Sequence, residues 1–368
     1  MEYAQEYIAT LHDLTETVPD APLSTSAVVV PIAGTEPADV APEHVFRTLE
    51  AVSPSVVIVP LRAPAETVTA FREWVHQFDL SVAVLWCNAD AVETKLARNG
   101  LDGESGKGRD VWLGLGVAAA RADYIAVHDA DATTYSRAHV PRLLAPLTQQ
   151  YQFVKGYYAR VENRQLYGRL TRLLVVPVLR ALERRHDENL LSYLSAFRYP
   201  LAGEFAITAQ MAMRVRAQRA WGLEIGLLGE AYTHAGREHS AQVDLGVHRH
   251  DHRPVAGSEG LSSMADEVAG ALFRVLADHG VDPEYELLRE AYHEHAARLI
   301  EQYDADASFN GLSYDRQAEY EQVRAYAPSI QPPAVDTRLP AWETLDISPA
   351  EILTASQEAT ATTSVSLD

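Results

Sequence analysis

The sequence predicts an α/β protein with a doubly wound, mainly parallel sheet. Short, continuous apolar segments recur in the first half of the chain, at 27–33, 55–61, 81–87 and 123–128. Such segments are typical of strands that are buried on both faces of a parallel sheet. Helical segments separate them, at 66–78, 109–122 and 137–148. Strands that alternate with helices favour a doubly wound arrangement, in which ligands bind beyond the carboxyl ends of the strands.

The second half is less regular and predicts further strands and longer helices. Strands are expected at 151–157, 204–207 and 241–248, and helices at 167–184, 223–234, 261–279 and 283–303. After residue 328 large apolar residues are few, so a poorly ordered tail is expected. The predicted parts are an N-terminal helical arm (1–22), a first α/β half (23–150), a second, less regular half (151–256), C-terminal helices (257–327) and the tail (328–368).

Composition and charge exclude several classes of protein. With 368 residues, 47% of them hydrophobic and 22% charged, the chain is globular rather than collagen-like or disordered. The 51 acidic residues outnumber the 31 Lys and Arg residues, and the net charge of −20 argues against a nucleic-acid partner. The start carries no signal-peptide pattern, and the best apolar run, at 173–179, is too short to span a membrane. A cytoplasmic protein without a membrane partner is expected.

Cysteine and lysine are rare. The single cysteine, Cys87, cannot form an internal disulfide, and its apolar neighbours indicate a buried thiol. Lysine occurs only at Lys95, Lys107 and Lys155. An acidic, lysine-poor surface stays hydrated in concentrated salt, so a halophilic source is one interpretation. Drift in a GC-rich genome is the other.

The strongest chemical signal is Asp129-Ala130-Asp131, directly after the strand expected at 123–128. Two carboxylates at i and i+2, beyond the carboxyl end of a buried strand, can hold a divalent cation. Such a cation bridges phosphate oxygens and neutralises charge as a nucleotide leaves. The alternative is an aspartate pair that caps the following turn and helix.

Other motifs offer groups for an anion or a metal. GKG at 106–108 precedes a predicted helix, whose N-terminus favours anions, and in GRLT at 168–171 an arginine and a hydroxyl suit a phosphate. The alternatives are a flexible turn and a solvated helix face. Along VHRHDHRP at 247–254, a continuing strand would place three histidines on one face, where an imidazole could complete a metal shell with Asp131. Spare histidines at a solvated strand end are the alternative.

In this order the motifs resemble those of retaining GT-A glycosyltransferases, more narrowly the glucosyl-3-phosphoglycerate and mannosyl-3-phosphoglycerate synthases. The matching stretches are GKG at 106–108, DAD at 129–131, FVKGYY at 153–158, GRLT at 168–171, PLAGEFA at 200–206, LEIGLL at 223–228 and VDLGVHRHDHRP at 243–254. The resemblance implies a GT-A (Rossmann-like) mixed sheet flanked by helices, with a helical C-terminal extension. It also implies a homodimer.

The resemblance implies roles on the donor side. Asp131 and His250 are expected to hold Mg²⁺ or Mn²⁺ against the diphosphate of a nucleotide-sugar donor. Pro31, Lys107 and Asp129 are expected to bind the donor together with Asp131, with Lys107 near the base and Asp129 near the ribose.

On the acceptor side, the resemblance implies that the phosphate of 3-phosphoglycerate binds at Gly168, Arg169 and Thr171, with His252 nearby. Glu224 is expected close to the donor sugar. Catalysis would consist mainly of positioning and charge stabilisation. The side chains expected to carry it are those of Asp131, Glu224 and Arg169.

The chain departs from the family pattern at three places. The first strand usually ends in Pro-x-x-Asn-Glu-Glu, whereas this chain has PIAGTE at 31–36. The second strand usually delivers an aspartate, whereas VPLR stands at 59–62. Both positions touch the nucleoside in the family, so the donor base stays open. His252 stands where an asparagine is frequent.

The leading hypothesis is a metal-dependent retaining transferase that moves glucose from an NDP-glucose, with UDP-glucose favoured, to 3-phosphoglycerate. Its product would be a precursor of the compatible solute glucosylglycerate. The alternatives are mannosyl transfer from GDP-mannose, a glycerate acceptor, a nucleotide-sugar-binding protein without transferase activity, and a lipid-linked acceptor. The strong negative charge disfavours the last, because anionic leaflets repel such a surface.

Overall fold

The computed structural model describes residues 5–34, 40–249 and 257–366, and within them one mixed sheet forms the centre of the molecule. Its strands are β1 (Ala9–Leu11), β2 (Ser26–Val29), β3 (Ile32–Ala33), β4 (Val56–Arg62), β5 (Val82–Trp86), β6 (Tyr124–Val127), β7 (Phe153–Glu162), β8 (Gln165–Leu166), β9 (Phe205–Thr208) and β10 (Ser240–His248). The order is β1-β10-β7-β9-β6-β2-β4-β3, with β5 beside β4 and β8 beside β7. Neighbouring strands run parallel except that β9 is antiparallel to β6 and β7, and β8 to β7. The predicted α/β fold with a mixed sheet is confirmed.

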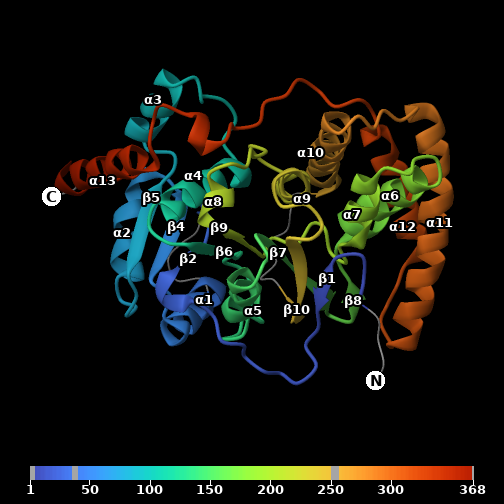
Figure 1. Ribbon diagram of the computed structural model, residues 1–368, viewed down its shortest axis with the longest axis horizontal. Coiled ribbons are helices and arrows are strands. Elements are labelled where there is room, and N and C mark those ends of the chain that lie inside the picture. Colours follow the sequence, from blue (N-terminus) through green and yellow to red (C-terminus); the bar gives the residue numbers. More distant parts are fainter. Residues whose placement is uncertain (1–4, 35–39, 250–256, 367–368) are drawn as a thin grey trace.

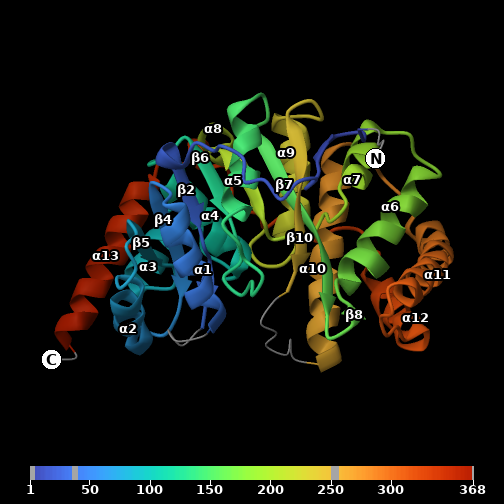
Figure 2. The same cartoon turned by 90° about the horizontal axis from the view of Figure 1, so that it is seen from below.

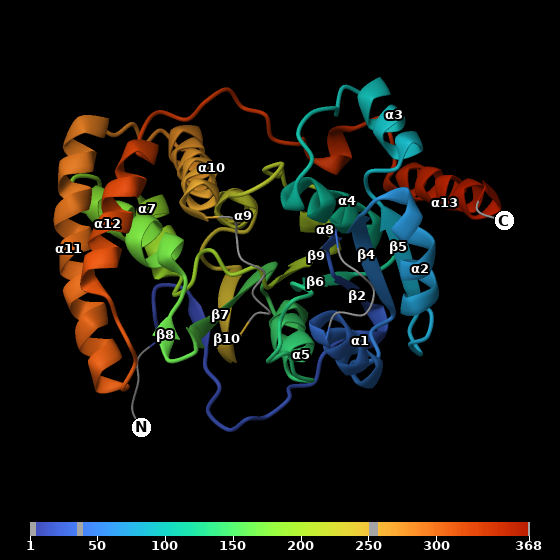
Figure 3. The ribbon, with the colours of Figure 1, turned by 180° about the vertical axis from the view of Figure 1, so that it is seen from behind.

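Helices cover both faces of the sheet and both of its ends. They are α1 (Val40–Val52), α2 (Ala65–Val75), α3 (Asp90–Arg98), α4 (Lys107–Ala119), α5 (His139–Leu144), α6 (Val176–Glu183), α7 (Asn189–Ala196), α8 (Ala209–Ala212), α9 (Leu223–His234), α10 (Gly257–Asp278), α11 (Tyr285–Phe309), α12 (Arg316–Tyr326) and α13 (Pro349–Ser366). Figures 1 and 3 show α1 and α5 on one side of the sheet and α4, α8 and α9 on the other. The group α6, α7, α11 and α12 lies at one end, and α2, α3 and α13 at the other.

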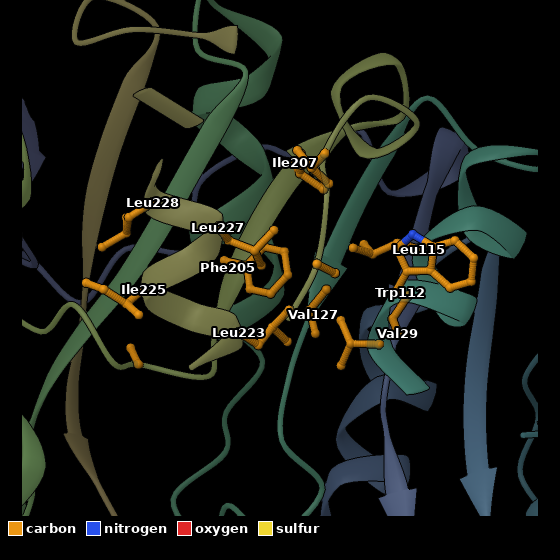
Figure 4. Packing of buried hydrophobic residues seen from close by; sticks show 14 of the residues in the cluster. Val29, Trp112, Leu115, Val127, Phe205, Ile207, Leu223, Ile225, Leu227 and Leu228 are labelled. Carbon is orange, nitrogen blue, oxygen red and sulfur yellow. The ribbon is translucent and has the colours of Figure 1, made fainter. Parts of the chain in front are cut away.

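The core follows from the apolar strand segments that the sequence predicts. Every residue of β2 is buried, as is every residue of β4 except Arg62. Figure 4 shows Val127 of β6 and Phe205 of β9 between side chains of α9, such as Leu223, and Trp112 of α4. Burying each such large apolar side chain stabilises the fold by about 1.5–3 kcal/mol. The thiol of Cys87 is also fully buried, as predicted, and its burial raises its pKa well above the ordinary value.

The N-terminal segment is not the helical arm that the sequence predicts. Residues 5–22 contain β1 and no helix, and β1 extends the sheet by pairing parallel to β10, with Ala9 opposite Ala241. The Gln5 side chain hydrogen-bonds both the N–H and the carbonyl of Thr10. Figures 1 and 2 show the segment crossing from β1 to β2. The helix prediction is wrong because pairing with a distant strand overrides local preference here.

The expected poorly ordered tail is also wrong. After α12 the chain crosses the molecule and ends in α13, which packs against α2, α3, α4 and β5 (Figure 1). Leu339, Trp342 and Ile352 are at most 2% exposed. The Trp342 ring stacks on Trp112 with centroids 4.0 Å apart. Few apolar residues suffice because each one fills a place in the core of the first half.

Within the described ranges, no helix combines the length and apolar character that a membrane-spanning helix needs.

Candidate active site

Antiparallel β9 brings a loop of the second half to the end of β6. Phe205 lies opposite Val127, so the register places Gly203 opposite Asp129 just beyond the strand ends. A Cβ atom on Gly203 would lie 2.4 Å from Oδ2 of Asp129. Glycine is therefore required where the carboxylate approaches the backbone.

Lys107 connects two of the predicted site carboxylates. It is the first residue of α4, after Gly106 as N-cap, and its Nζ lies 2.7 Å from Oδ1 of Asp129 and 3.2 Å from Oε1 of Glu224. Burial alone would lower the pKa of Lys107, but the two carboxylates outweigh it and raise the pKa above the ordinary value. A charged ammonium thus holds Asp129 against Glu224, which lies in the first turn of α9.

Asp131 is exposed on the loop that follows β6. This loop is joined to the end of β10 through Arg249. The backbone N–H of Thr133 donates to the Arg249 carbonyl over 2.8 Å, and the N–H of Arg249 donates to Oγ1 of Thr134 over 3.0 Å. The chain that leads into His250 is thereby fixed beside the Asp131 loop.

The donor set at this loop fits a divalent cation that substrate phosphates help to bind. His250 and His252 lie outside the described residues, and within those residues no three metal-ligating side chains gather. Mg²⁺ in phosphate-transfer sites is usually held by one or two carboxylates together with substrate phosphates. The carboxylate of Asp131 is exposed and meets that need.

Buried imidazoles lie behind the strand end, and the sequence analysis did not predict this. His128 is fully buried and its ring meets that of Tyr135 edge-on at 5.1 Å; Tyr135 in turn contacts His139, also at 5.1 Å. Burial, followed by the charges of His139 and His248, lowers the pKa of His128 well below its ordinary value. Burial, followed by the charge of His248, lowers the pKa of His139 to about 4.

A further histidine, His248, and a buried carboxylate, Glu204, lie close to these rings. His248 stacks on Tyr158 at 4.2 Å, and its Nε2 lies 3.4 Å from Oε1 of Glu204, which is 1% exposed. Lys155 is also buried and donates to the carbonyl of Ala202. Burial, outweighing the neighbouring carboxylates, lowers the pKa of Lys155 to about 8. The buried carboxylate of Glu204 thus has His248 as a partner.

Stability is expected to fall as the pH drops from about 6.5, the pKa of an unfolded histidine, to about 4. In this pH range His139 binds a proton in the unfolded chain but stays neutral in the folded chain. The free energy of unfolding therefore decreases by roughly 1 kcal/mol per pH unit for this group. Urea unfolding followed by circular dichroism measures the slope. His139→Gln should flatten it, whereas His76→Gln, at an exposed position, should not. An unchanged slope in His139→Gln would contradict the assignment.

The predicted acceptor motif begins an irregular helix. Gly168 has φ +78°, and a Cβ there would lie 2.6 Å from the hydroxyl of Tyr199. A π-helical turn, Thr171–Val175, follows and leads into α6, in place of the regular helix predicted from 167. Such turns are frequent at functional sites. Thr171 is 4% exposed, and its hydroxyl has no hydrogen-bond partner within the described part of the chain.

Two arginines beside this turn share one buried carboxylate from α12. The Nε of Arg169 lies 2.8 Å from Oε1 of Glu319, and Nη1 of Arg172 lies 2.7 Å from Oε2. Glu319 is 3% exposed and also accepts from the Tyr314 hydroxyl. Thr171 and Arg172 are buried, whereas the side chain of Arg169 is 40% exposed, so only part of this segment faces solvent. The sequence did not predict Glu319.

We call the edge of the sheet at which β2, β4 and β6 end the donor edge, because the donor is expected to bind there. Pro31 follows β2, which lies between β4 and β6. Strands β2 and β6 end level with Ile58, and β4 continues beyond them to Arg62. Arg62 ends β4, and its Nε donates to Oδ2 of Asp110 over 2.8 Å. The structure brings Pro31, Arg62 and Asp129 to one edge of the sheet.

Comparisons with known proteins agree with this arrangement. No family model matches the chain. The glucosyl-3-phosphoglycerate synthase of Methanococcoides burtonii is 34% identical over 371 residues, covering 92% of this chain and 90% of the relative. That of Persephonella marina is 37% identical over 286 residues, covering 73% and 71%.

Solved structures of the Mycobacterium tuberculosis enzyme share the fold. One, in complex with Mn²⁺, UDP-glucose and phosphoglyceric acid, matches with a TM-score of 0.57 and 25% identity over 75% of this chain and 89% of that chain. Another, with Mg²⁺ and UDP, has a TM-score of 0.57 and 24% identity over 75% and 88%.

The mixed sheet and the carboxylates at its strand ends define a glycosyltransferase of the GT-A type. Within that class, the chain belongs to the family of glucosyl-3-phosphoglycerate synthases, to which its identity extends over most of both chains.

Proposed function

We propose that this protein transfers glucose, with retention, from an NDP-glucose to 3-phosphoglycerate, and that UDP-glucose is the favoured donor. The observation that carries the proposal is the pair of ion contacts by which Lys107 joins Asp129 to Glu224 beside the Asp131 loop. The complexes of the M. tuberculosis enzyme with UDP-glucose and phosphoglyceric acid support the choice of substrates. The product would be glucosyl-3-phosphoglycerate, a precursor for compatible-solute synthesis.

On the donor side, Asp131 and His250 would hold Mg²⁺ or Mn²⁺, and Asp129 would accept hydrogen bonds from the ribose. Bound metal would neutralise charge on the leaving nucleoside diphosphate. Lys107 fixes the carboxylate of Glu224, which then accepts hydrogen bonds from the glucose hydroxyls. Catalysis by these residues is mainly positioning, since their side chains are held in place before substrate arrives.

On the acceptor side, the phosphate would bind at the start of the π-helical turn. The buried Thr171 hydroxyl and the Nη groups of Arg169 offer donors to it, while Glu319 holds Nε of Arg169. Residues 23–150 would thus supply most of the donor site and 151–256 most of the acceptor site. The homodimer, the cytoplasmic location and the salt-adapted surface stay predictions.

A donor-by-acceptor matrix tests the function. UDP-glucose, GDP-glucose and GDP-mannose are each combined with 3-phosphoglycerate or glycerate, with Mg²⁺ or Mn²⁺, and released nucleoside diphosphate is measured. Release from a glucose donor that needs both metal and 3-phosphoglycerate is expected. If only GDP-mannose were turned over, the transferred sugar would be mannose rather than glucose. If only glycerate supported activity, the acceptor would be glycerate rather than 3-phosphoglycerate. Donor binding without any release would indicate a binding protein.

Arg169→Ala is expected to raise the KM for 3-phosphoglycerate about ten- to hundredfold with little change in the donor KM, because a charge-assisted fork to the phosphate is lost. Initial rates at varied acceptor concentration measure it. Arg184→Ala, at the exposed C-terminal end of α6, is the control. An unchanged acceptor KM would mean that the phosphate binds elsewhere.

A further inference from the structure

Arg62 occupies the donor edge of the sheet without a role in the function proposed above. It is the last residue of β4, and β2 separates β4 from β6, the strand that leads into Asp129. Val127, the last residue of β6, lies level with Ile58 of β4, and β4 continues for four more residues to Arg62. With about 4.8 Å between adjacent strands and about 3.3 Å per residue along a strand, the ends of β4 and β6 are separated by roughly 16 Å. Sheets of this type bind nucleotides across the ends of such neighbouring strands. A nucleoside that extended from the Asp131 loop along this edge of the sheet would reach Arg62.

Arg62 is held in place by one side of its guanidinium. Its Nε donates to Oδ2 of Asp110, which is 2% exposed and lies in the first turn of α4. Asp110 comes three residues after Lys107, so both project from the same side of this helix. One helical turn therefore fixes Asp129 through Lys107 and Arg62 through Asp110. Burial raises the pKa of Asp110, and the hydrogen bond from Arg62 opposes that rise and favours the charged pair.

The other side of the guanidinium is available to a ligand. Within the described residues, Nη1 and Nη2 of Arg62 have no hydrogen-bond partner, and the side chain is 34% exposed. Two terminal amino groups in one plane, fixed by a buried carboxylate, form a preorganised pair of donors. A guanidinium offers only donors and accepts no hydrogen bond.

We propose that Arg62 recognises the nucleobase of the donor and selects bases that carry a keto oxygen at C4 of a pyrimidine or C6 of a purine. This rests on the proposed function, since it assumes a nucleoside-diphosphate sugar. Uracil and guanine offer such an oxygen, at O4 and O6, whereas cytosine and adenine present an amino group at the equivalent position. When such an amino group faces Arg62, donors face donors and neither the amino group nor the guanidinium finds an acceptor. Binding of these bases is weakened, because unpaired donors carry a desolvation penalty once water is excluded.

The test compares four glucose donors that differ only in the base: UDP-, GDP-, CDP- and ADP-glucose. The wild-type kcat/KM is expected to favour UDP- and GDP-glucose over the other two by about ten- to hundredfold. Arg62→Met, which keeps the length but removes the donors, should reduce this preference to less than about threefold while the KM for 3-phosphoglycerate stays unchanged. Arg98→Met, at an exposed position on α3, should keep the wild-type preference.

A binding measurement separates this proposal from the function itself. Calorimetric titration with UDP and with CDP, in the presence of Mn²⁺, should show a stronger preference for UDP in the wild type than in Arg62→Met. If no donor is turned over but the binding preference depends on Arg62, the proposed transfer fails and the recognition role stands. An equal preference in the wild type and Arg62→Met, or none in the wild type, overturns the role of Arg62.

Discussion

Asp131→Ala is expected to lower kcat at least about a hundredfold, the usual effect of removing a group that stabilises developing charge. Asp131 is the exposed carboxylate of the loop after β6, and Asp129 is already engaged with Lys107, so no neighbouring carboxylate on this loop substitutes for it. Initial rates with a glucose donor, 3-phosphoglycerate and saturating Mn²⁺ measure the effect.

Binding provides a second measurement for the same variant. Mn²⁺ should strengthen UDP binding in the wild type but not in Asp131→Ala, because the carboxylate that anchors the cation is missing. Asp187→Ala, at an exposed position away from the loop, should behave as the wild type. Wild-type turnover in Asp131→Ala would remove this residue from the active site.

Trp342→Ala is expected to lower the free energy of unfolding by about 3–5 kcal/mol, as large-to-small changes in a core do. The ring is 2% exposed, stacks on Trp112 at an interplanar angle of 12° and donates from Nε1 to the Trp112 carbonyl over 3.0 Å. Gly116 packs so closely that a Cβ there would lie 2.5 Å from the Trp342 ring. The substitution therefore leaves a cavity and removes the hydrogen bond to the Trp112 carbonyl.

Urea unfolding followed by circular dichroism at 222 nm measures this loss without relying on tryptophan emission. Trp221→Ala is the matched control, since that ring is 44% exposed and should cost less than about 1 kcal/mol. A loss below about 1 kcal/mol for Trp342→Ala would mean that the C-terminal segment adds little to the core.

The central strands could be predicted because burial on both faces leaves continuous apolar segments, as in β2 and β4. The two chain ends could not. β1 is extended because it pairs with β10, more than two hundred residues away in the chain. The last segment is sparse in apolar residues, yet Leu339 and Trp342 are buried. Local composition does not report such distant partners.

The candidate site was predictable to a similar degree. Asp129, Asp131 and Lys107 stand directly at a strand end or a helix start, where sequence position alone suggests a ligand. Glu319 and Arg62 could not be assigned in the same way. The contact of Glu319 with Arg169 joins residues 150 positions apart, and that of Arg62 with Asp110 spans 48. Only the folded chain shows that these pairs exist.

The crossing of the C-terminal segment also has a consequence for the order in which the protein is built. The first half of the chain leaves the ribosome long before Trp342, so the face of α4 that carries Trp112 stays uncovered until the segment around Trp342 has emerged. That helix also begins with Lys107, whose ammonium joins Asp129 to Glu224. The donor edge therefore reaches its final packing only after Trp342 has emerged, and a nascent chain that stops before Trp342 exposes Trp112 to premature association.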